Sequence, residues 1–120
     1  MPAKRPDLRR GRIVWATVVD RNGMPKQRPA IILTPTEEIK VDEPMVVMAV
    51  TTTYTEPPPD DHVELPWDNR GHRITKLRRR SAAVLTWLDE VLPKKVIEFG
   101  GDVPTKQMKT IDEKLDELNA

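Results

Sequence analysis

The sequence predicts a mostly β domain with added helix, an α+β fold, on three observations. Short runs rich in Val, Ile and Thr alternate with turn-forming residues along most of the chain. There are twelve prolines in 120 residues, well above the usual frequency of about 5%, which favours short strands joined by rigid loops. The C-terminal end carries apolar residues at clear helical spacing. We therefore predict a small, mostly antiparallel barrel or rolled sheet closed by one C-terminal helix.

The clearest hairpin lies near the N-terminus. Two β-rich runs, residues 12–19 and 30–34, flank a polar connection over residues 20–29. This connection contains Asn22-Gly23, the strongest short-range hairpin signal, because both residues tolerate a positive φ angle. We expect two strands joined by this loop, the second of them ended by Pro35.

The connection over residues 20–29 is basic. It carries Arg21, Lys26 and Arg28 and has no acidic residue after Asp20. A basic loop held between two stiff strands is suited to binding an anion. The alternative is a solvated hairpin with ordinary surface charges, and local sequence alone favours that alternative.

Four further β-rich segments follow. Residues 45–55 are strongly β-prone and should supply the central strand. Residues 62–65 and 96–99 are typical of short strands. Residues 81–91 have β character, but a helix is also compatible with their periodicity.

The C-terminal segment predicts a helix. Its apolar residues are spaced by three, four and three positions, so they lie on one helical face. They are Met108, Ile111, Leu115 and Leu118. Thr105 is the expected N-cap, with Asp102 as the alternative. The apolar stripe should pack on the sheet.

The chain is predicted to be one domain preceded by a tail. Residues 1–10 combine basic residues with prolines and lack periodic apolar positions, so we expect a flexible basic tail there and a single domain over residues 11–120. There is no cysteine, which excludes disulfides and thiolate chemistry. No apolar run approaches the roughly 20 residues that span a membrane, and the N-terminus lacks the apolar core of a secretory signal. We expect no membrane contact and a cytoplasmic location.

Charges are segregated although the net charge is only +1. Residues 36–69 contain nine acidic residues and one basic residue, whereas residues 70–80 contain six basic residues and no acidic one. Such blocks predict separate positive and negative surfaces, of which the positive one could hold a polyanion. Solvated loops with no binding role are the alternative.

Several segments together resemble the MazF/PemK family, in the order found in that family from Gly11 to Leu118. They are residues 11–15 (Gly-Arg-Ile-Val-Trp), residues 27–33 (Gln-Arg-Pro-Ala-Ile-Ile-Leu), residues 50–52 (Val-Thr-Thr), Ser81 after a basic stretch, and residues 101–104 (Gly-Asp-Val-Pro) before the last helix. The resemblance implies an SH3-like barrel with added helices.

The same resemblance implies a function and partners. The family consists of endoribonuclease toxins of bacterial type II toxin–antitoxin pairs, which cleave single-stranded RNA such as mRNA without a metal or other cofactor. It implies a homodimer with RNA in the dimer groove. It also implies a cognate antitoxin protein whose acidic, disordered tail occupies the same groove.

Two residues match the family's catalytic positions. Arg28 matches its arginine and Thr51 its strand-end threonine. Cleavage without metal requires removal of the ribose 2′-proton, stabilisation of the phosphorane charge and protonation of the leaving 5′-oxygen. A guanidinium suits the phosphorane, and a hydroxyl can donate to a phosphoryl oxygen. Arginine is a poor proton acceptor, so His62 is the candidate base, although nothing in the sequence places it near Arg28.

The candidate RNA-binding residues are basic, amide, hydroxyl or aromatic. They are Arg21, Lys26, Gln27, Thr52, Tyr54, Trp67, Arg78, Arg79, Arg80 and Ser81. Tyr54 and Trp67 are suited to stacking on unpaired bases, or else anchor loops by packing. The arginine run at 78–80 should face phosphates in part, because three adjacent arginines cannot all point inward on a strand. No His, Asp or Glu cluster has metal-ligand spacing.

One departure from the family keeps alternatives open. Many members carry an Arg-x-Asp-Gln step where this chain has residues 83–86, Ala-Val-Leu-Thr, so an arginine and an acid are absent. One alternative is therefore a module of the same fold that has lost catalysis and binds RNA or a partner protein. Another is a toxin directed against gyrase, since such toxins share this fold.

Overall fold

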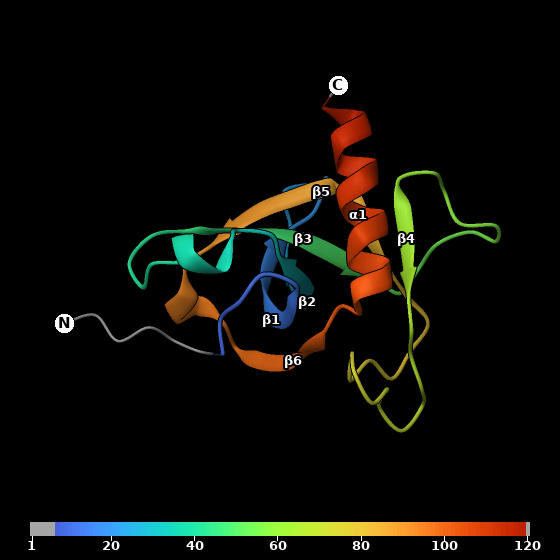
Figure 1. Ribbon diagram of the computed structural model, residues 1–120, viewed down its shortest axis with the longest axis horizontal. Coiled ribbons are helices and arrows are strands. Elements are labelled where there is room, and N and C mark those ends of the chain that lie inside the picture. The colour runs from blue at the N-terminus through green and yellow to red at the C-terminus, as the bar shows by residue number, and fades with distance from the viewer. Residues whose placement is uncertain (1–6, 120) are drawn as a thin grey trace.

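The computed structural model of the chain describes residues 7–119 (Figure 1). Its strands and helix are β1 (Arg12–Val19), β2 (Pro25–Ile32), β3 (Met45–Thr51), β4 (His62–Leu65), β5 (Ser81–Val91), β6 (Glu98–Asp102) and α1 (Thr105–Leu118). Single 3-10 turns, Thr36–Glu38 and Pro93–Lys95, follow β2 and β5. The predicted bounds of β1 and β4 are confirmed, and residues 81–91 form a strand rather than a helix. No helix among the described residues is long and apolar enough to cross a membrane.

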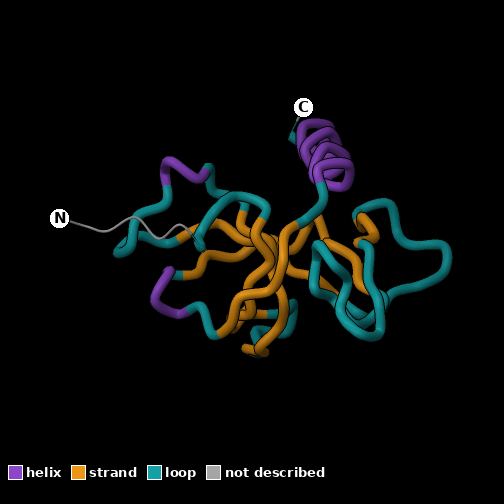
Figure 2. The backbone as a smooth tube through the Cα atoms, turned by 60° about the horizontal axis from the view of Figure 1, so that its bottom comes forward, coloured by secondary structure: helices purple, strands orange, loops and turns teal. Residues whose placement is uncertain are grey.

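The six strands form one sheet in the order β4-β5-β3-β2-β1-β6, and every neighbouring pair is antiparallel. This confirms the predicted fold class, a mostly β domain with a C-terminal helix. The sheet is strongly twisted (Figure 2). Its two edge strands, β4 and β6, do not pair with each other, so the sheet is not closed into a complete barrel.

The turn of the first hairpin follows its sequence. Gly23 has a φ angle of +77°, a conformation that glycine adopts without steric cost. The Asp20 carboxylate accepts hydrogen bonds from the backbone N–H groups of Asn22 and Met24, each at 2.9 Å. These local bonds complete the turn, so the chain has reversed direction by Met24.

β2 begins earlier than predicted. It starts at Pro25 and pairs with β1 over its length, with Arg28 opposite Ala16. The predicted loop over residues 20–29 is therefore wrong beyond Met24. A proline removes only its own N–H, so pairing with one neighbouring strand continues on either side of it. As a result, Arg28 lies on a rigid strand.

Two other strands also differ from their predicted bounds. β3 ends at Thr51 rather than at residue 55, because the Thr51 hydroxyl bonds to the Thr53 backbone and such local bonds compete with strand pairing. β6 covers Glu98–Asp102 rather than residues 96–99. It includes Gly100, where an added Cβ would lie 3.2 Å from the Ile13 carbonyl oxygen, so the close approach of β6 to β1 favours glycine.

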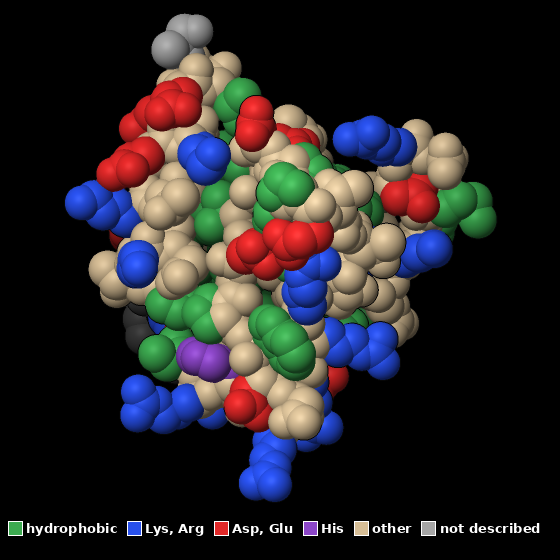
Figure 3. Space-filling view, turned by 90° about the vertical axis from the view of Figure 1, so that its right-hand side faces the viewer, with side chains coloured by type: hydrophobic (Ala, Val, Ile, Leu, Met, Phe, Trp, Pro, Cys, Tyr) green, Lys and Arg blue, Asp and Glu red, His purple; other side chains and the backbone are tan. Residues whose placement is uncertain are grey.

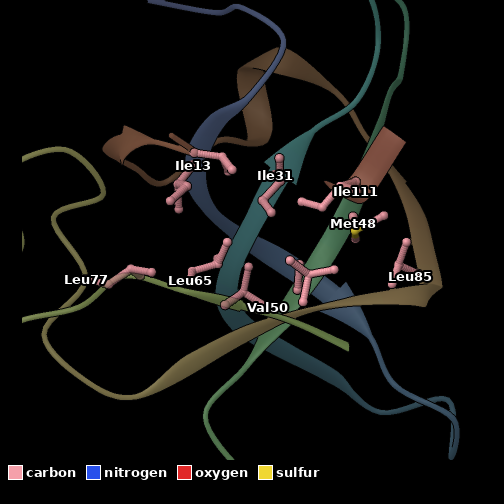
Figure 4. Packing of buried hydrophobic residues seen from close by; sticks show 11 residues of the cluster. Ile13, Ile31, Met48, Val50, Leu65, Leu77, Leu85 and Ile111 are labelled. Atoms are coloured by element: carbon pink, nitrogen blue, oxygen red, sulfur yellow. The ribbon is translucent and has the colours of Figure 1, made fainter. Parts of the chain in front are cut away.

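Apolar side chains pack on both faces of the sheet. One cluster joins the sheet to α1 and contains Ile13, Ile31, Met48, Leu85 and Ile111 (Figure 4). The other cluster contains Val14, Val18, Ile32 and Val47, which alternate with members of the first along their strands. Both faces of the central strands are therefore buried, as their continuous apolar runs indicate.

Helix α1 follows three of its four predicted apolar positions. Ile111 is fully buried, and Met108 and Leu115 pack against the first cluster. Leu118 remains 57% exposed at the helix end. The predicted cap is wrong, because the helix starts at Thr105 and its N-cap is Pro104, which has no side-chain cap bond.

The predicted flexible tail over residues 1–10 is wrong for residues 7–10, and residues 1–6 lie outside the described part of the chain. Leu8 is 3% exposed and packs in the second cluster. Arg9 donates two hydrogen bonds to Asp102, and Arg10 donates two to Asp112 on α1. The partners lie at the other end of the chain, which explains why local composition did not indicate this packing.

The long β4–β5 connection, residues 66–80, is attached to the free edge of β6. The Gly101 N–H donates to the Thr75 carbonyl at 3.1 Å, and the Asp102 N–H donates to the Ile74 carbonyl at 2.9 Å. An ideal Cβ at position 101 would lie 1.9 Å from the Ile74 carbonyl oxygen, so only glycine fits. This contact fixes the segment that leads to Arg78 and Arg79.

Candidate functional site

Arg28 and Thr51 are brought together by the pairing of β2 with β3. The recorded pairing ends at Ala30 opposite Ala49, and continuing it by two residues places Arg28 opposite Thr51. Both residues line one cleft of about 560 Å³. The cleft is lined by Trp15, Gln27, Arg28, Pro29, Val50, Thr51, Thr52, Thr53, Leu77, Arg78, Arg79 and Ser81.

The Arg28 side chain is half-buried and stacked. Its Cζ lies 4.3 Å from the centroid of the Trp87 ring. Its Nε is buried without a hydrogen-bond partner, and within residues 7–119 the structure records no ion pair of Arg28 with a carboxylate. A buried N–H without a partner is costly. An acceptor that enters the cleft and bonds to Arg28 Nε would therefore remove this cost.

The Thr51 hydroxyl is engaged only locally. It donates to the Thr53 carbonyl at 3.3 Å and accepts from the Thr53 N–H at 3.2 Å. These are long hydrogen bonds. A phosphoryl oxygen in the cleft could replace the carbonyl as the acceptor of the Thr51 proton.

A smaller hollow of about 280 Å³ adjoins the cleft and shares Thr51 and Thr53 with it. His62 and Trp87 line this hollow, as does Arg21 of the hairpin turn. The structure therefore places His62 and Thr51 in the walls of one hollow, which nothing in the sequence indicated.

The His62 ring is held by its neighbour Asp61. His62 Nδ1 lies 2.8 Å from Asp61 Oδ1, and Thr86 donates to Asp61 Oδ2 at 2.6 Å. The hydrogen bond from Thr86 is the main cause that lowers the pKa of Asp61 below its usual value; burial opposes it, and the bond with His62 reinforces it. A carboxylate thus stands beside β5 although residues 83–86 contain none.

Another part of the cleft wall is formed by the start of β5 and the segment before it. Arg78 and Arg79 are exposed and line the cleft. Ser81 also lines it, but its hydroxyl is buried and donates to the Arg79 carbonyl at 2.7 Å. Ser81 therefore holds the wall in place, and this geometry does not support its predicted contact with RNA.

Arg80, predicted to bind RNA, is instead bound to acidic partners. It donates to Glu56 at 2.7 Å and lies 3.6 Å from Glu64. Its Cζ is 3.9 Å from the Tyr54 ring centroid, and the Tyr54 hydroxyl donates to Glu64 at 3.0 Å. Neither Arg80 nor Tyr54 lines the cleft. Arg79 and Arg80 precede β5, and the Arg80 side chain contacts the acidic 56–64 segment, whereas Arg79 lines the cleft.

Tyr54 should titrate at an unusually high pH. Burial, and after it the hydrogen bond to Glu64, raise the pKa of Tyr54 to about 12. Because the folded-state pKa exceeds the ordinary value of about 10, the neutral Tyr54 phenol contributes fully to the free energy of unfolding below about pH 10. This contribution is lost as the pH rises toward about 12. The chain has one tyrosine, so phenolate absorbance reports Tyr54 alone. Glu64→Gln should move the midpoint down, and a wild-type midpoint near 10 would contradict the contact.

The other predicted RNA-binding residues are dispersed. Gln27 and Thr52 line the cleft. Lys26 is exposed on β2 opposite Val18, outside both hollows. Trp67 is 47% exposed in the 66–80 segment and also lies outside both. Figure 3 shows one face of the molecule, and several Lys and Arg side chains project at its lower end.

Two residues at the site were missed by the sequence prediction. Asp61 could have been found from its position directly before His62. The contact of Trp87 with Arg28 could not be found from local sequence, because it joins two strands that are not neighbours in the sheet. Among residues 7–119 there is no group of three or more His, Asp or Glu side chains arranged to hold a metal ion.

Comparisons with known proteins agree with this architecture. The family model described as "PemK-like, MazF-like toxin of type II toxin-antitoxin system" matches residues 9–118. MazF from Deinococcus radiodurans has a TM-score of 0.71 at 19% identity, covering 92% of this chain and 94% of that chain. A MazE–MazF structure from the same organism has a TM-score of 0.70 at 18% identity, covering 95% and 96%. No curated protein sequence matches.

A third similar structure is an endoribonuclease in complex with its cognate antitoxin from a mycobacterial species. Its TM-score is 0.68 at 14% identity, with 92% of each chain covered. The fold, a six-stranded antiparallel sheet with a C-terminal helix, is therefore that of MazF. The match over residues 9–118 shows that the chain belongs to the PemK-like, MazF-like toxin family of type II toxin–antitoxin systems.

Proposed function

We propose that this protein is the toxin of a toxin–antitoxin pair and cleaves single-stranded RNA, such as mRNA, without a metal ion. The observation that carries the proposal is the shared cleft of Arg28 and Thr51, which lie on neighbouring strands. A phosphodiester in this cleft meets a guanidinium with an unpaired N–H from one strand and a hydroxyl from the next.

The proposed chemistry is attack by the ribose 2′-oxygen. A base removes the 2′-proton, the 2′-oxygen bonds to phosphorus, and the bond from phosphorus to the 5′-oxygen breaks. The products are a 2′,3′-cyclic phosphate and a 5′-hydroxyl, whose oxygen takes its proton from a solvent water. Arg28 stabilises the added negative charge of the phosphorane through paired N–H donors, and Thr51 donates to a phosphoryl oxygen.

His62 is the proposed base. Its Nδ1 is held by Asp61, and His62 shares the adjoining hollow with Thr51. A carboxylate bonded to one ring nitrogen fixes the orientation of the imidazole and leaves the other nitrogen to accept a proton. The exposed Arg78 and Arg79 on the cleft wall are suited to hold the flanking phosphates.

The proposal extends to partners. The similar structures include complexes of MazF with MazE and of an endoribonuclease with its cognate antitoxin. We therefore expect a cognate antitoxin to bind this protein, with its acidic segment competing with RNA for the basic walls of the cleft. We also propose a homodimer that holds RNA between its subunits and acts in the cytoplasm, as the resemblance to this family implies; the family match over residues 9–118 supports it.

A second candidate function is RNA binding without cleavage. Residues 83–85 are buried and apolar where many family members have Arg-x-Asp, and the Thr51 hydroxyl already has bonding partners. This candidate predicts salt-dependent binding with no new RNA ends.

The test is incubation of a mixed-sequence single-stranded RNA with the protein in EDTA, followed by mapping of the ends. We expect discrete cuts with 2′,3′-cyclic phosphate ends, and none when the mapped nucleotide carries a 2′-deoxy substitution. His62→Ala should lower kcat by about 10²- to 10⁴-fold, the usual contribution of a general base, while RNA binding is retained. Binding without cuts would replace the proposal by the second candidate. If the protein neither binds nor cuts RNA but inhibits supercoiling by gyrase, the proposal is replaced by a gyrase-directed toxin.

A further inference from the structure

Trp87 contacts Arg28 through its ring face and is itself held at its edge. The Arg28 Cζ lies 4.3 Å from the ring centroid. Trp87 Nε1 donates to the Val19 carbonyl at 2.8 Å, and the Val19 N–H in turn donates to Asp89 at 3.0 Å. The ring is thus fixed to the end of β1, while its face supports a side chain from β2.

The backbone of β5 is shaped to deliver this ring. Pairing with β3 passes from Met48 opposite Leu88 to Val50 opposite Ala83, so Ala49 alone stands opposite residues 84–87 of β5. Such a bulge bends a strand and redirects its side chains, and bulges are frequent beside active sites. Trp87 lies within this irregular stretch, although β5 and β2 are not neighbours in the sheet.

The stacked geometry explains how Arg28 can remain without an anionic partner. A guanidinium on an aromatic face is attracted by the ring quadrupole, and this attraction leaves its in-plane N–H groups free. Arg28 Nε is buried and has no hydrogen-bond partner. A carboxylate in place of the ring would occupy those N–H groups and compete with phosphate.

We infer that Trp87 is a positioning residue for RNA cleavage, acting through Arg28 by holding its guanidinium flat so that the paired N–H donors face the phosphate. The inference rests on the proposed function. Arg28 has several rotatable bonds, and without the ring its guanidinium would sample orientations that miss the phosphorane. Misplacement of a catalytic group by about 1 Å can cost about 10²-fold in rate.

The test combines steady-state kinetics with a double-mutant cycle. Trp87→Leu should lower kcat about 10²-fold and leave KM nearly unchanged, whereas Trp87→Phe keeps a ring face and should retain most of the activity. In an Arg28→Ala background, Trp87→Leu should cause no further loss. Leu88→Ala, an exposed neighbour on β5, is the matched control. Multiplicative losses in the double variant, or equal losses for Phe and Leu, would overturn the inference.

A second readout does not depend on activity. In the free protein, ring current from Trp87 should shift the Arg28 Nε–H proton resonance, and Trp87→Leu should abolish this shift while Leu88→Ala retains it. If no shift is present, the contact is absent in solution and the inference fails. A wild type that shows the shift but cuts no RNA would refute the proposed function instead. If Trp87→Leu unfolds, Trp87→Met and Trp87→Phe provide the comparison.

Discussion

Replacing Arg28 with alanine should lower kcat for RNA cleavage by about 10²- to 10³-fold, the range observed when one donor to a developing oxyanion is removed. The expected loss is large because, among the lining residues that β2 and β3 contribute to the cleft, Arg28 alone is a cation. Arg28→Lys should recover only part of the rate, since an ammonium keeps the charge but lacks the planar pair of donors.

Measuring the free energy of unfolding of Arg28→Ala shows whether a loss of rate comes from the missing guanidinium or from unfolded protein. Arg28→Ala loses the contact with the Trp87 ring, worth about 0.5–1 kcal/mol, but also removes a buried Nε that lacks a partner. We therefore expect the free energy of unfolding to change by less than about 1 kcal/mol. Lys40→Ala is the control for net charge, because Lys40 is exposed in the acidic segment. Its Nζ lies 3.9 Å from Glu43 Oε1. Undiminished cleavage by Arg28→Ala, mapped to the same ends, would remove Arg28 from the mechanism.

Gly101→Ala should destabilise the protein by roughly 3 kcal/mol, combining the cost of overpacking with the loss of backbone hydrogen bonds. The added Cβ would lie 1.9 Å from the Ile74 carbonyl oxygen and 2.6 Å from the Thr75 carbonyl carbon. Both are backbone atoms, so the 66–80 segment must leave the edge of β6. Chemical denaturation measures the change.

Gly100→Ala is the matched neighbour. Its Cβ would lie 3.2 Å from the Ile13 carbonyl oxygen, which a shift of a few tenths of an ångström relieves, so its effect should be clearly smaller. Because the displaced segment leads to Arg78 and Arg79, Gly101→Ala should also weaken RNA binding. Equal stability of Gly101→Ala and wild type would show that the segment is not attached to β6 in solution.

The sequence alone determined those features that depend on neighbouring residues. The Asn22-Gly23 turn, the β-rich runs and the helical spacing of Met108, Ile111 and Leu115 were sufficient for the fold class, because turn chemistry and periodicity act within a few residues. The resemblance to a known family then singled out Arg28 and Thr51. Register explains why they share one cleft, since continuing the pairing of β2 with β3 two residues beyond Ala30 and Ala49 brings the two positions opposite each other.

Only the tertiary structure decided which partner each side chain has. Residues 7–10, predicted to be mobile, are held by Asp102 and Asp112. Arg80, predicted to bind RNA, is neutralised by Glu56 and Glu64, whereas Arg28 meets the face of Trp87. These contacts join segments far apart in the chain. Local sequence does not distinguish an arginine that contacts an acid from one that contacts an aromatic ring or solvent. Tertiary packing therefore decides which guanidinium stays available to bind a phosphate.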